Sequence, residues 1–246
     1  MNRFFYEAKQ RTGQTVILQG DDAFHLRHVL RLQSGEQIEL CGPDGVCHSA
    51  VIVDLAKESV QCRLKEELPD HEPKIAVDLA FALLKGDRMD FALQKATEIG
   101  ATAFFPVTSS RTVVKLPAKT EQKVQRWQRI VRSAAAQAHR NRVPVVHFPR
   151  EFIALPALFA FYDRVLFFWE EARRGSLASA LQGIGPGARL LLVSGPEGGF
   201  SPEEAVLAQK AGALVVTLGP RILRAETAAI AAVALTLYQA GEMEGR

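Results

Sequence analysis

The sequence lacks the features of secreted, membrane-spanning and zinc-binding proteins. Its 246 residues include three cysteines, Cys41, Cys47 and Cys62, which cannot all pair and form no C-x-x-C motif. Cys41, Cys47 and His48 match no common zinc spacing, so we expect the cysteines to pack in or near strands and no metal to bind. No apolar run approaches the length of a membrane span, and the start lacks the apolar region of a signal peptide. These absences predict a cytoplasmic protein without membrane contact.

Net charge is also low, at +3, but it is unevenly distributed. Residues 1–72 contain 8 Lys and Arg against 12 Asp and Glu, whereas residues 73–246 contain 22 against 15. The positive surplus of the second part hints at a nucleic-acid partner for that part.

Two regions of the chain differ in pattern. Residues up to 67 form short runs rich in β-branched residues, interrupted by one helical piece at 21–30, which predicts a small barrel or curled sheet. Residues 68–74, LPDHEPK, have the composition of a linker. From residue 75 onward, apolar strands without polar alternation are joined by helices, which predicts an α/β domain with a parallel sheet covered on both faces. We therefore expect domains at 1–70 and 71–246.

The motifs that bind phosphate are missing or out of place. G-x-x-x-x-G-K-[ST] is absent, and the G-x-G-x-x-A match at 183–188 precedes an apolar strand instead of following one. A dinucleotide site needs the order strand, glycines, helix, because the pyrophosphate rests on the helix N-terminus. The sequence therefore gives no support to a nucleotide-dependent oxidoreductase.

A glycine-rich stretch with the right context occurs at 194–204, SGPEGGFSPEE, after the apolar strand ARLLLV. Its second half, 201–204, has an N-cap serine, a proline at N1 and a capping-box glutamate. The three glycines before it exceed what capping requires, which indicates that something lies very close to the backbone. Glu197 would repel a phosphate but would tolerate a neutral or cationic ligand. We call this stretch the elbow.

A second unusual loop lies within TLGPRILRAETAA, residues 217–229. A strand ends near Leu218 and an Ala-rich helix begins near Glu226. Arg224 stands where the helix dipole is positive, so it is expected to have a carboxylate partner, such as Glu226, or an anionic ligand. Both loops leave parallel strands at their C-terminal ends, where open α/β sheets bind ligands, so we expect one pocket formed by two loops.

The two loops, GPEGGFSPEE and LGPRILRAETAA, resemble the paired C-terminal motifs of the bacterial methyltransferases that modify uracil N3 in 16S ribosomal RNA, members of the SPOUT superfamily. HLRHVLRL, KGDRMDFALQKATEIG, SSRTVVK and AAAQAHRNRVP also occur in the family's order, so the resemblance covers most of the chain. It implies a PUA-like β-barrel in the first domain and a deep trefoil knot in the second. It further implies S-adenosylmethionine as cofactor, 16S ribosomal RNA of the small subunit as substrate, and a homodimer.

The resemblance also assigns roles to individual residues. Phe168, Trp169 and Glu170 either cover the cofactor or pack in the core. In the chemistry we assign Arg224 to stabilise a uracil anion and Glu197 or Glu226 to accept the proton. By motif match the cofactor would contact the two loops through Ser194, Gly195, Glu197, Gly198, Gly199, Leu218, Gly219, Ile222, Leu223, Arg224 and Thr227.

Basic residues gather on one expected helix. Residues 121–143 carry six Lys and Arg against one Glu, while apolar residues recur there at helical spacing, so the charged face is expected to remain outside. This ratio favours phosphate contact over a merely solvated face. With four residues from other motifs, the RNA-binding candidates are Arg27, Arg31, Arg111, Lys115, Lys123, Arg126, Arg129, Arg132, Arg140 and Arg142.

Two other functions stay open on sequence grounds. One is an enzyme of the same fold that methylates a ribose 2′-hydroxyl of rRNA or tRNA, and the other is a non-catalytic rRNA-binding assembly factor. The intact glycines of both loops argue against the assembly factor, and product analysis separates the two enzymes.

Overall fold

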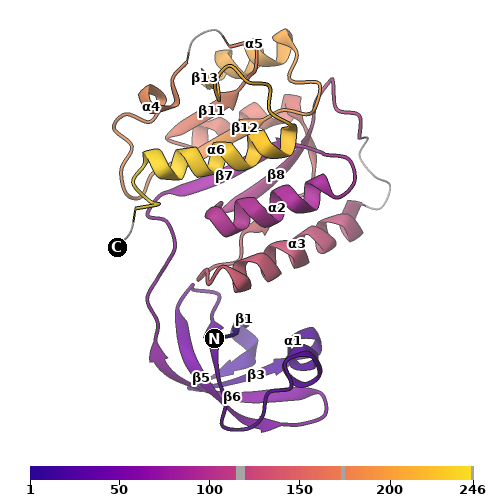
Figure 1. Cartoon of the computed structure of the whole chain (residues 1–246), viewed down its shortest axis with the longest axis vertical. Coiled ribbons are helices and arrows are strands. Elements are labelled where there is room, and N and C mark those ends of the chain that lie inside the picture. The colour runs from indigo at the N-terminus through magenta and orange to yellow at the C-terminus, as the bar shows by residue number, and fades with distance from the viewer. Residues whose placement is uncertain (115–119, 173–174, 245–246) are drawn as a thin grey trace. The chain divides into compact units, whose positions relative to one another are not determined.

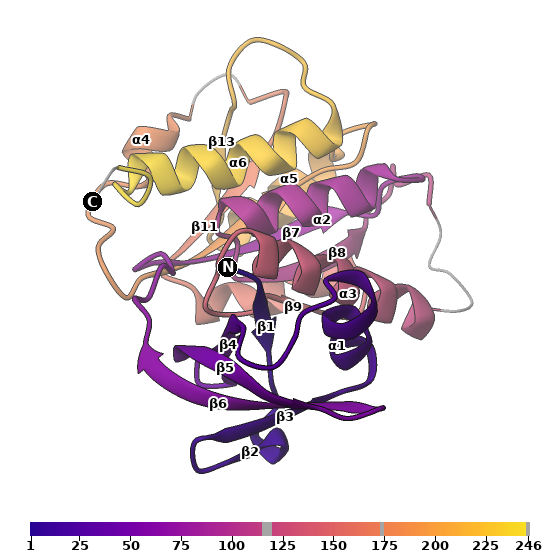
Figure 2. The same cartoon turned by 60° about the horizontal axis from the view of Figure 1, so that its bottom comes forward.

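A computed structural model describes residues 1–114, 120–172 and 175–244 (Figures 1 and 2). The chain divides into two compact units. The first contains residues 1–72 and 135–143, and the second contains residues 73–134 and 144–246. The chain therefore passes through the first unit twice. The domains expected from the sequence, 1–70 and 71–246, have no such second passage.

The first unit is built on a six-stranded sheet with the strand order β1-β4-β5-β6-β3-β2. Its pairs are antiparallel except for β1 and β4, which are parallel. The strands are β1 (Arg3–Phe5), β2 (Arg11–Thr12), β3 (Thr15–Gln19), β4 (Gln37–Cys41), β5 (Cys47–Leu55) and β6 (Ser59–Glu67). The helical pieces are η1 (Ala8–Gln10), α1 (Gly20–Phe24) and its continuation η2 (His25–Val29).

Alternation of apolar residues places the core of this sheet. In β3, Val16 and Leu18 are fully buried while Ile17 between them is 41% exposed. In β6, Val60, Cys62 and Leu64 alternate in the same way and join one buried cluster with the β3 residues. The β-rich character expected for this part is confirmed.

All three cysteines lie buried in strands, as expected. Cys41 at the end of β4 and Cys47 at the start of β5 face each other and form a disulfide, which the sequence reasoning did not foresee. The two positions are directly opposite in the antiparallel ladder, with Cα atoms 4.0 Å apart. Cys62 is unpaired, and burial raises the pKa of its thiol to about 12.

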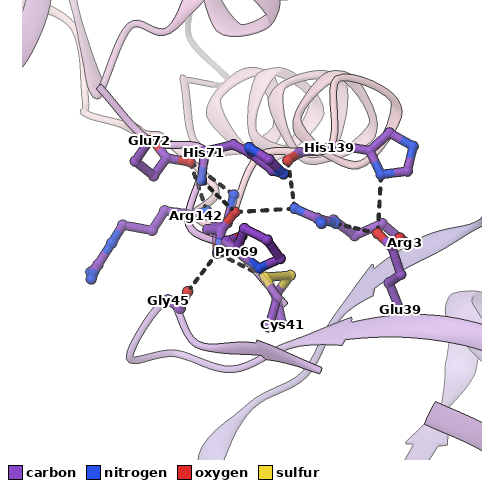
Figure 3. A network of polar contacts seen from close by, with 11 residues as sticks. Arg3, Glu39, Cys41, Gly45, Pro69, His71, Glu72, His139 and Arg142 are labelled. Carbon is purple, nitrogen blue, oxygen red and sulfur yellow. Dashed lines mark hydrogen bonds and ion pairs between the residues drawn. A yellow bond between two sulfur atoms is a disulfide. The ribbon is translucent and has the colours of Figure 1, made fainter. Parts of the chain in front are cut away.

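Asn141 connects the second passage through the first unit to residues of the first passage, of which Arg3, Gly45, Pro69 and His71 are labelled in Figure 3. Its amide nitrogen donates to the carbonyl oxygens of Gly45 and Pro69, each at 3.3 Å. Its carbonyl oxygen accepts from Arg3 Nη1 and from the backbone N–H of His71, again at 3.3 Å. Asn141 is 1% exposed, so its side chain is buried with its polar atoms paired to two neighbouring loops and to β1.

Arg3, Glu39 and His139 form an ion-pair cluster, which Figure 3 shows. Glu39 accepts from Arg3 Nε at 2.8 Å and contacts His139 Nδ1 at 3.0 Å. Burial alone would raise the pKa of Glu39, but the hydrogen bonds and charges of Arg3 and His139 hold it below its usual value. The cluster ties residue 139 to β1 and β4.

The second unit has a parallel sheet with the order β10-β8-β7-β12-β11-β13, and β9 pairs with β8. Its strands are β7 (Ala76–Ala82), β8 (Ala103–Thr108), β9 (Val145–Val146), β10 (Arg150–Glu151), β11 (Arg164–Phe168), β12 (Arg189–Ser194) and β13 (Leu214–Val216). The helices are α2 (Arg88–Ile99), α3 (Thr120–Gln137), η3 (Phe152–Phe161), α4 (Leu177–Ala180), α5 (Pro202–Lys210) and α6 (Ala225–Gln239). The last three residues of α3 belong to the first unit.

Helices cover both faces of the parallel sheet. On one face α6 packs against β7, β12 and α2. Figure 1 shows the two helices α2 and α6 side by side. On the other face η3 and α5 form a cluster with alternate sheet residues, including Leu191 and Val193 of β12. Because β12 is buried on both sides, its sequence shows no polar alternation. The expected α/β class is confirmed, and none of the described helices is long and apolar enough to cross a membrane.

Candidate cofactor and substrate site

A pocket of about 400 Å³ opens at the C-terminal edge of the parallel sheet. Its walls are residues 194–197 and Gly199 of the elbow after β12, residues 217–223 after β13, and residues 168–170 after β11. Parallel strands bring these three loops to one edge because all their carboxyl ends meet there. The prediction that the chain makes one pocket from two loops is confirmed, and a third loop contributes.

The second half of the elbow is a capped helix start, as its sequence predicted. Ser201 Oγ accepts from the N–H of Glu204 at 3.3 Å, and the Glu204 carboxylate accepts from the N–H of Ser201 at 2.8 Å. Pro202 occupies the first turn of α5. The other carboxylate oxygen of Glu204 accepts from the N–H of Ser110 at 2.8 Å. Glu204 therefore also fastens the loop that follows β8 to the elbow.

The glycines of the elbow allow neighbouring side chains to approach the backbone. Gly199 has φ +67°, and a Cβ there would lie 1.6 Å from Glu170 Oε1. A Cβ at Gly198 would lie 3.4 Å from the Cβ of Arg111, whose guanidinium donates to the Gly198 carbonyl at 3.1 Å. Only glycine fits at 199 without displacing Glu170, and the close approach leaves that carboxylate on the pocket wall.

Arg88 connects the elbow to the start of α6. Its Nη1 lies 3.2 Å from Glu197 Oε1, and its Nε lies 3.9 Å from Glu226 Oε1. Glu226 is 9% exposed, and its Oε2 has no hydrogen-bond partner among the described residues. One guanidinium therefore offsets the repulsion between two carboxylates beside the pocket.

Sequence reasoning assigned no role to Arg88, although a signal was present. Arg88 begins α2, so it places a cation at the positive end of the helix dipole. The same anomaly drew attention to Arg224. A cation at this position of the motif KGDRMD indicates that Arg88 has a carboxylate or anionic partner. In the structure its partners are Glu197 and Glu226.

Eight of the eleven residues expected to contact the cofactor line the pocket: Ser194, Gly195, Glu197, Gly199, Leu218, Gly219, Ile222 and Leu223. Gly198, also in the elbow, lies against Arg111 and does not line the pocket. Arg224 and Thr227 are exposed at the start of α6 and are not part of the wall. Phe168, Trp169 and Glu170 do line it, and Trp169 Nε1 donates to the Phe200 carbonyl at 3.3 Å.

The RNA-binding candidates separate into engaged and exposed side chains. Arg140 is 5% exposed and forms an ion pair with Glu72, and Arg142 Nη2 donates to the Asp44 carbonyl at 2.7 Å. These two guanidinium groups hold the second passage of the chain to the first unit, which is a structural role. Arg27 donates to the Ala56 carbonyl.

Other candidates remain on the surface. The α3 side chains Val124, Trp127, Val131 and Ala134 are buried, which confirms the expected apolar face of this helix. The opposite face exposes Lys123, Arg126 and Arg129, of which Arg126 is paired with Asp90, while Arg132 is half-buried. Arg31 is exposed with φ +55°. Arg111 lies against the elbow, and Lys115 lies outside the described residues.

Comparisons with known proteins agree with this architecture. Residues 71–237 match a family described as RNA methyltransferase domain, and residues 18–65 match an RNA methyltransferase PUA domain. The whole chain is 35% identical to 99% of ribosomal RNA small subunit methyltransferase E of Bacillus subtilis. The crystal structure of ribosomal RNA small subunit methyltransferase E from Neisseria gonorrhoeae bound to S-adenosyl methionine is similar, with a TM-score of 0.84 and 35% identity over 97% of each chain. A putative methyltransferase of Legionella pneumophila in complex with the same cofactor has a TM-score of 0.86 and 31% identity over 96% of each chain.

Proposed function

This chain belongs to the ribosomal RNA small subunit methyltransferase E family, and we propose that it methylates N3 of one uridine in 16S ribosomal RNA. Membership makes it an S-adenosylmethionine-dependent rRNA methyltransferase. The observation that best supports the cofactor assignment is the acidic pocket, where Glu170 and Glu197 stand on the wall and no phosphate-binding motif is present.

The pocket residues fit the methyl donor. Its sulfonium is cationic, so the carboxylates of Glu170 and Glu197 favour it, whereas they would repel a phosphate. Gly199 permits the wall to approach closely, and the apolar side chains Leu218 and Leu223 suit a nucleoside. When bound, S-adenosylmethionine supplies the methyl group, and the protein's contribution to that step is to hold the target nitrogen in line.

Uracil N3 must lose a proton before it can accept a methyl group. With a pKa of roughly 9 to 10, deprotonation at neutral pH costs about 3–4 kcal/mol at 1.36 kcal/mol per unit. We assign Arg224 to stabilise the anion at O2 or O4, because it is an exposed cation beside the pocket with no ion-pair partner among the described residues.

Glu197 and Glu226 are the proposed proton acceptors. Both carboxylates lie beside Arg88, with Glu197 Oε1 3.2 Å from its Nη1 and Glu226 Oε1 3.9 Å from its Nε, and a carboxylate is a group that can accept a proton. Glu197 lines the pocket, whereas Glu226 does not, and the Oε2 atom of Glu226 is buried without a hydrogen-bond partner among the described residues.

We further propose a cytoplasmic homodimer with a deep trefoil knot in the second unit, as the family resemblance implies. The exposed side chains Leu235 and Tyr238 of α6, at 44% and 65% exposure, are suited to contact a second copy. Arg31, Lys123, Arg129 and Arg132 are the proposed phosphate contacts, because each is a cation that is exposed or half-buried.

Replacement of Arg224 by Ala tests the proposed chemistry. We expect turnover on small ribosomal subunits to fall by about 100-fold or more, as for removal of one anion-stabilising donor, while calorimetric affinity for S-adenosylmethionine is retained. Arg164→Ala is the matched control, because Arg164 begins β11 at the opposite edge of the sheet. Near-normal turnover of Arg224→Ala would reject the role of Arg224.

A further inference from the structure

A second pocket, of about 290 Å³, lies beside the first turn of α2. The turn between β7 and α2 contributes Lys85 and Asp87, and the exposed face of α3 contributes Lys123 and Arg126. Buried apolar side chains, including Trp127 at 5% exposure, form its floor. This volume is at the lower end of the about 300–1,000 Å³ typical of small-ligand sites, so it suits one nucleotide unit.

The charges of this pocket favour an anion. Arg126 is paired with Asp90, which neutralises both groups. Neither Lys85 nor Lys123 has an ion-pair partner within the described part of the chain, and both are exposed. With Asp87 as the remaining acid, the pocket carries one surplus positive charge on two free ammonium groups.

Two features of the turn and of α3 fit an extended phosphate chain better than a single free ion. Gly86 has φ +65° with no atom within 4 Å of where a Cβ would be, so the turn is open to a ligand. On α3, Lys123, Arg126 and Arg129 follow one another at intervals of three residues and are all exposed. Arg129 does not line the pocket, so it extends the positive charge of Lys123 along the helix beyond it, which favours a polyanion over a single ion.

The position of the pocket relates it to the cofactor site. Arg88, which contacts Glu197 on the wall of the large pocket, lies between Asp87 and Met89, which line the second pocket. The first turn of α2 therefore contributes residues to the second pocket and, through Arg88, a contact to the wall of the large pocket.

We propose that this second pocket binds a ribonucleotide unit next to the target uridine, with its phosphate held by Lys85 and Lys123. The inference rests on the proposed function and adds to it the place where the substrate strand enters. Arg126, fixed by Asp90, orients the rim, and the apolar floor contacts the ribose or base. Sequence analysis did not identify Lys85 as an RNA-binding residue.

The test is the double variant Lys85→Ala/Lys123→Ala, compared with Lys74→Ala/Lys210→Ala. The control removes the same charge from exposed positions that line neither pocket. Binding of small ribosomal subunits and of protein-free 16S ribosomal RNA is measured at several salt concentrations, together with calorimetric affinity for S-adenosylmethionine.

For the pocket variant we expect binding of both RNA probes to weaken on the order of tenfold near physiological salt, with a salt dependence of log Kd that is lower by about 0.7 for each phosphate lost. Cofactor affinity is expected to stay unchanged. Wild-type affinity and salt slope in the pocket variant would overturn the inference while methylation by the wild-type protein stands. A loss seen with intact subunits but not with protein-free RNA would also overturn it, since the partner would then be a ribosomal protein. Failure of the wild-type protein to methylate subunits would instead remove the proposed function and the inference together.

Discussion

Replacement of Gly199 by Ala isolates the contribution of the elbow to cofactor binding. Gly199 has φ +67°, and the added Cβ would stand 1.6 Å from Glu170 Oε1. The backbone conformation is costly for any residue with a Cβ, and the Glu170 carboxylate must leave its place on the pocket wall. The variant therefore changes the loop and one acidic side chain at the same time.

The magnitude follows from the backbone cost. A left-handed conformation costs an L-residue about 1–2 kcal/mol. If the free loop relaxes to avoid it, binding must restore the conformation and loses the same free energy, which corresponds to about 5–30-fold in the dissociation constant. If the loop does not relax, the cost appears as lower stability, a shift of about 2–4 °C in Tm for each kcal/mol.

Calorimetric titration with S-adenosylmethionine and thermal unfolding separate the two effects. Gly212→Ala is the matched control, because Gly212 has φ +97° with nothing within 4 Å of its added Cβ and does not line the large pocket. We expect a similar loss of stability in the control but no loss of cofactor affinity. Because the added Cβ displaces Glu170 from the pocket wall whether or not the loop relaxes, cofactor affinity should fall in either case. Equal cofactor affinities of Gly199→Ala and Gly212→Ala would therefore refute the assignment of the elbow to the cofactor.

Two further predictions concern the first unit. Arg140→Ala leaves Glu72 buried without its ion-pair partner, so the free energy of unfolding in denaturant should fall by about 3–5 kcal/mol. For the control Arg129→Ala, at an exposed position, the fall should be less than about 0.5 kcal/mol. Wild-type stability of Arg140→Ala would contradict the structural role of Arg140. The lowered pKa of Glu39 contributes stability that is present above its unfolded-state pKa of about 4.3 and is lost as pH falls through the folded-state value. The Tm should therefore fall more steeply between pH 7 and pH 3 for the wild-type protein than for Glu39→Gln. Parallel plots of Tm against pH would show that Glu39 does not cause the pH dependence of stability.

Local signals in the sequence predicted the elements that form the pocket. The capping box at 201–204 depends on residues three apart, and the glycines beside it lie within five positions, so both patterns can be recognised in a short stretch of sequence. The apolar face of α3 is a periodic signal over several turns, and its burial followed from that period. The parallel sheet followed from strands without polar alternation.

Contacts between distant segments could not be predicted in the same way. Arg88 and Glu197 are 109 residues apart, so no local pattern connects them, although the position of Arg88 at a helix start showed that it needed a partner. Arg140 looks like its basic neighbours in the sequence, and only the fold reveals that Glu72 meets it in a buried site. The disulfide of Cys41 depends on the register of two strands, which a count of cysteines does not give.

The most direct test of the account is identification of the methylated nucleoside. The purified protein is incubated with methyl-labelled S-adenosylmethionine and small ribosomal subunits that lack the modification, and the rRNA is digested to nucleosides for mass spectrometry. The account predicts label in 3-methyluridine, with about one methyl group per subunit. Label on a ribose or another base, or no label although the cofactor binds, would contradict it.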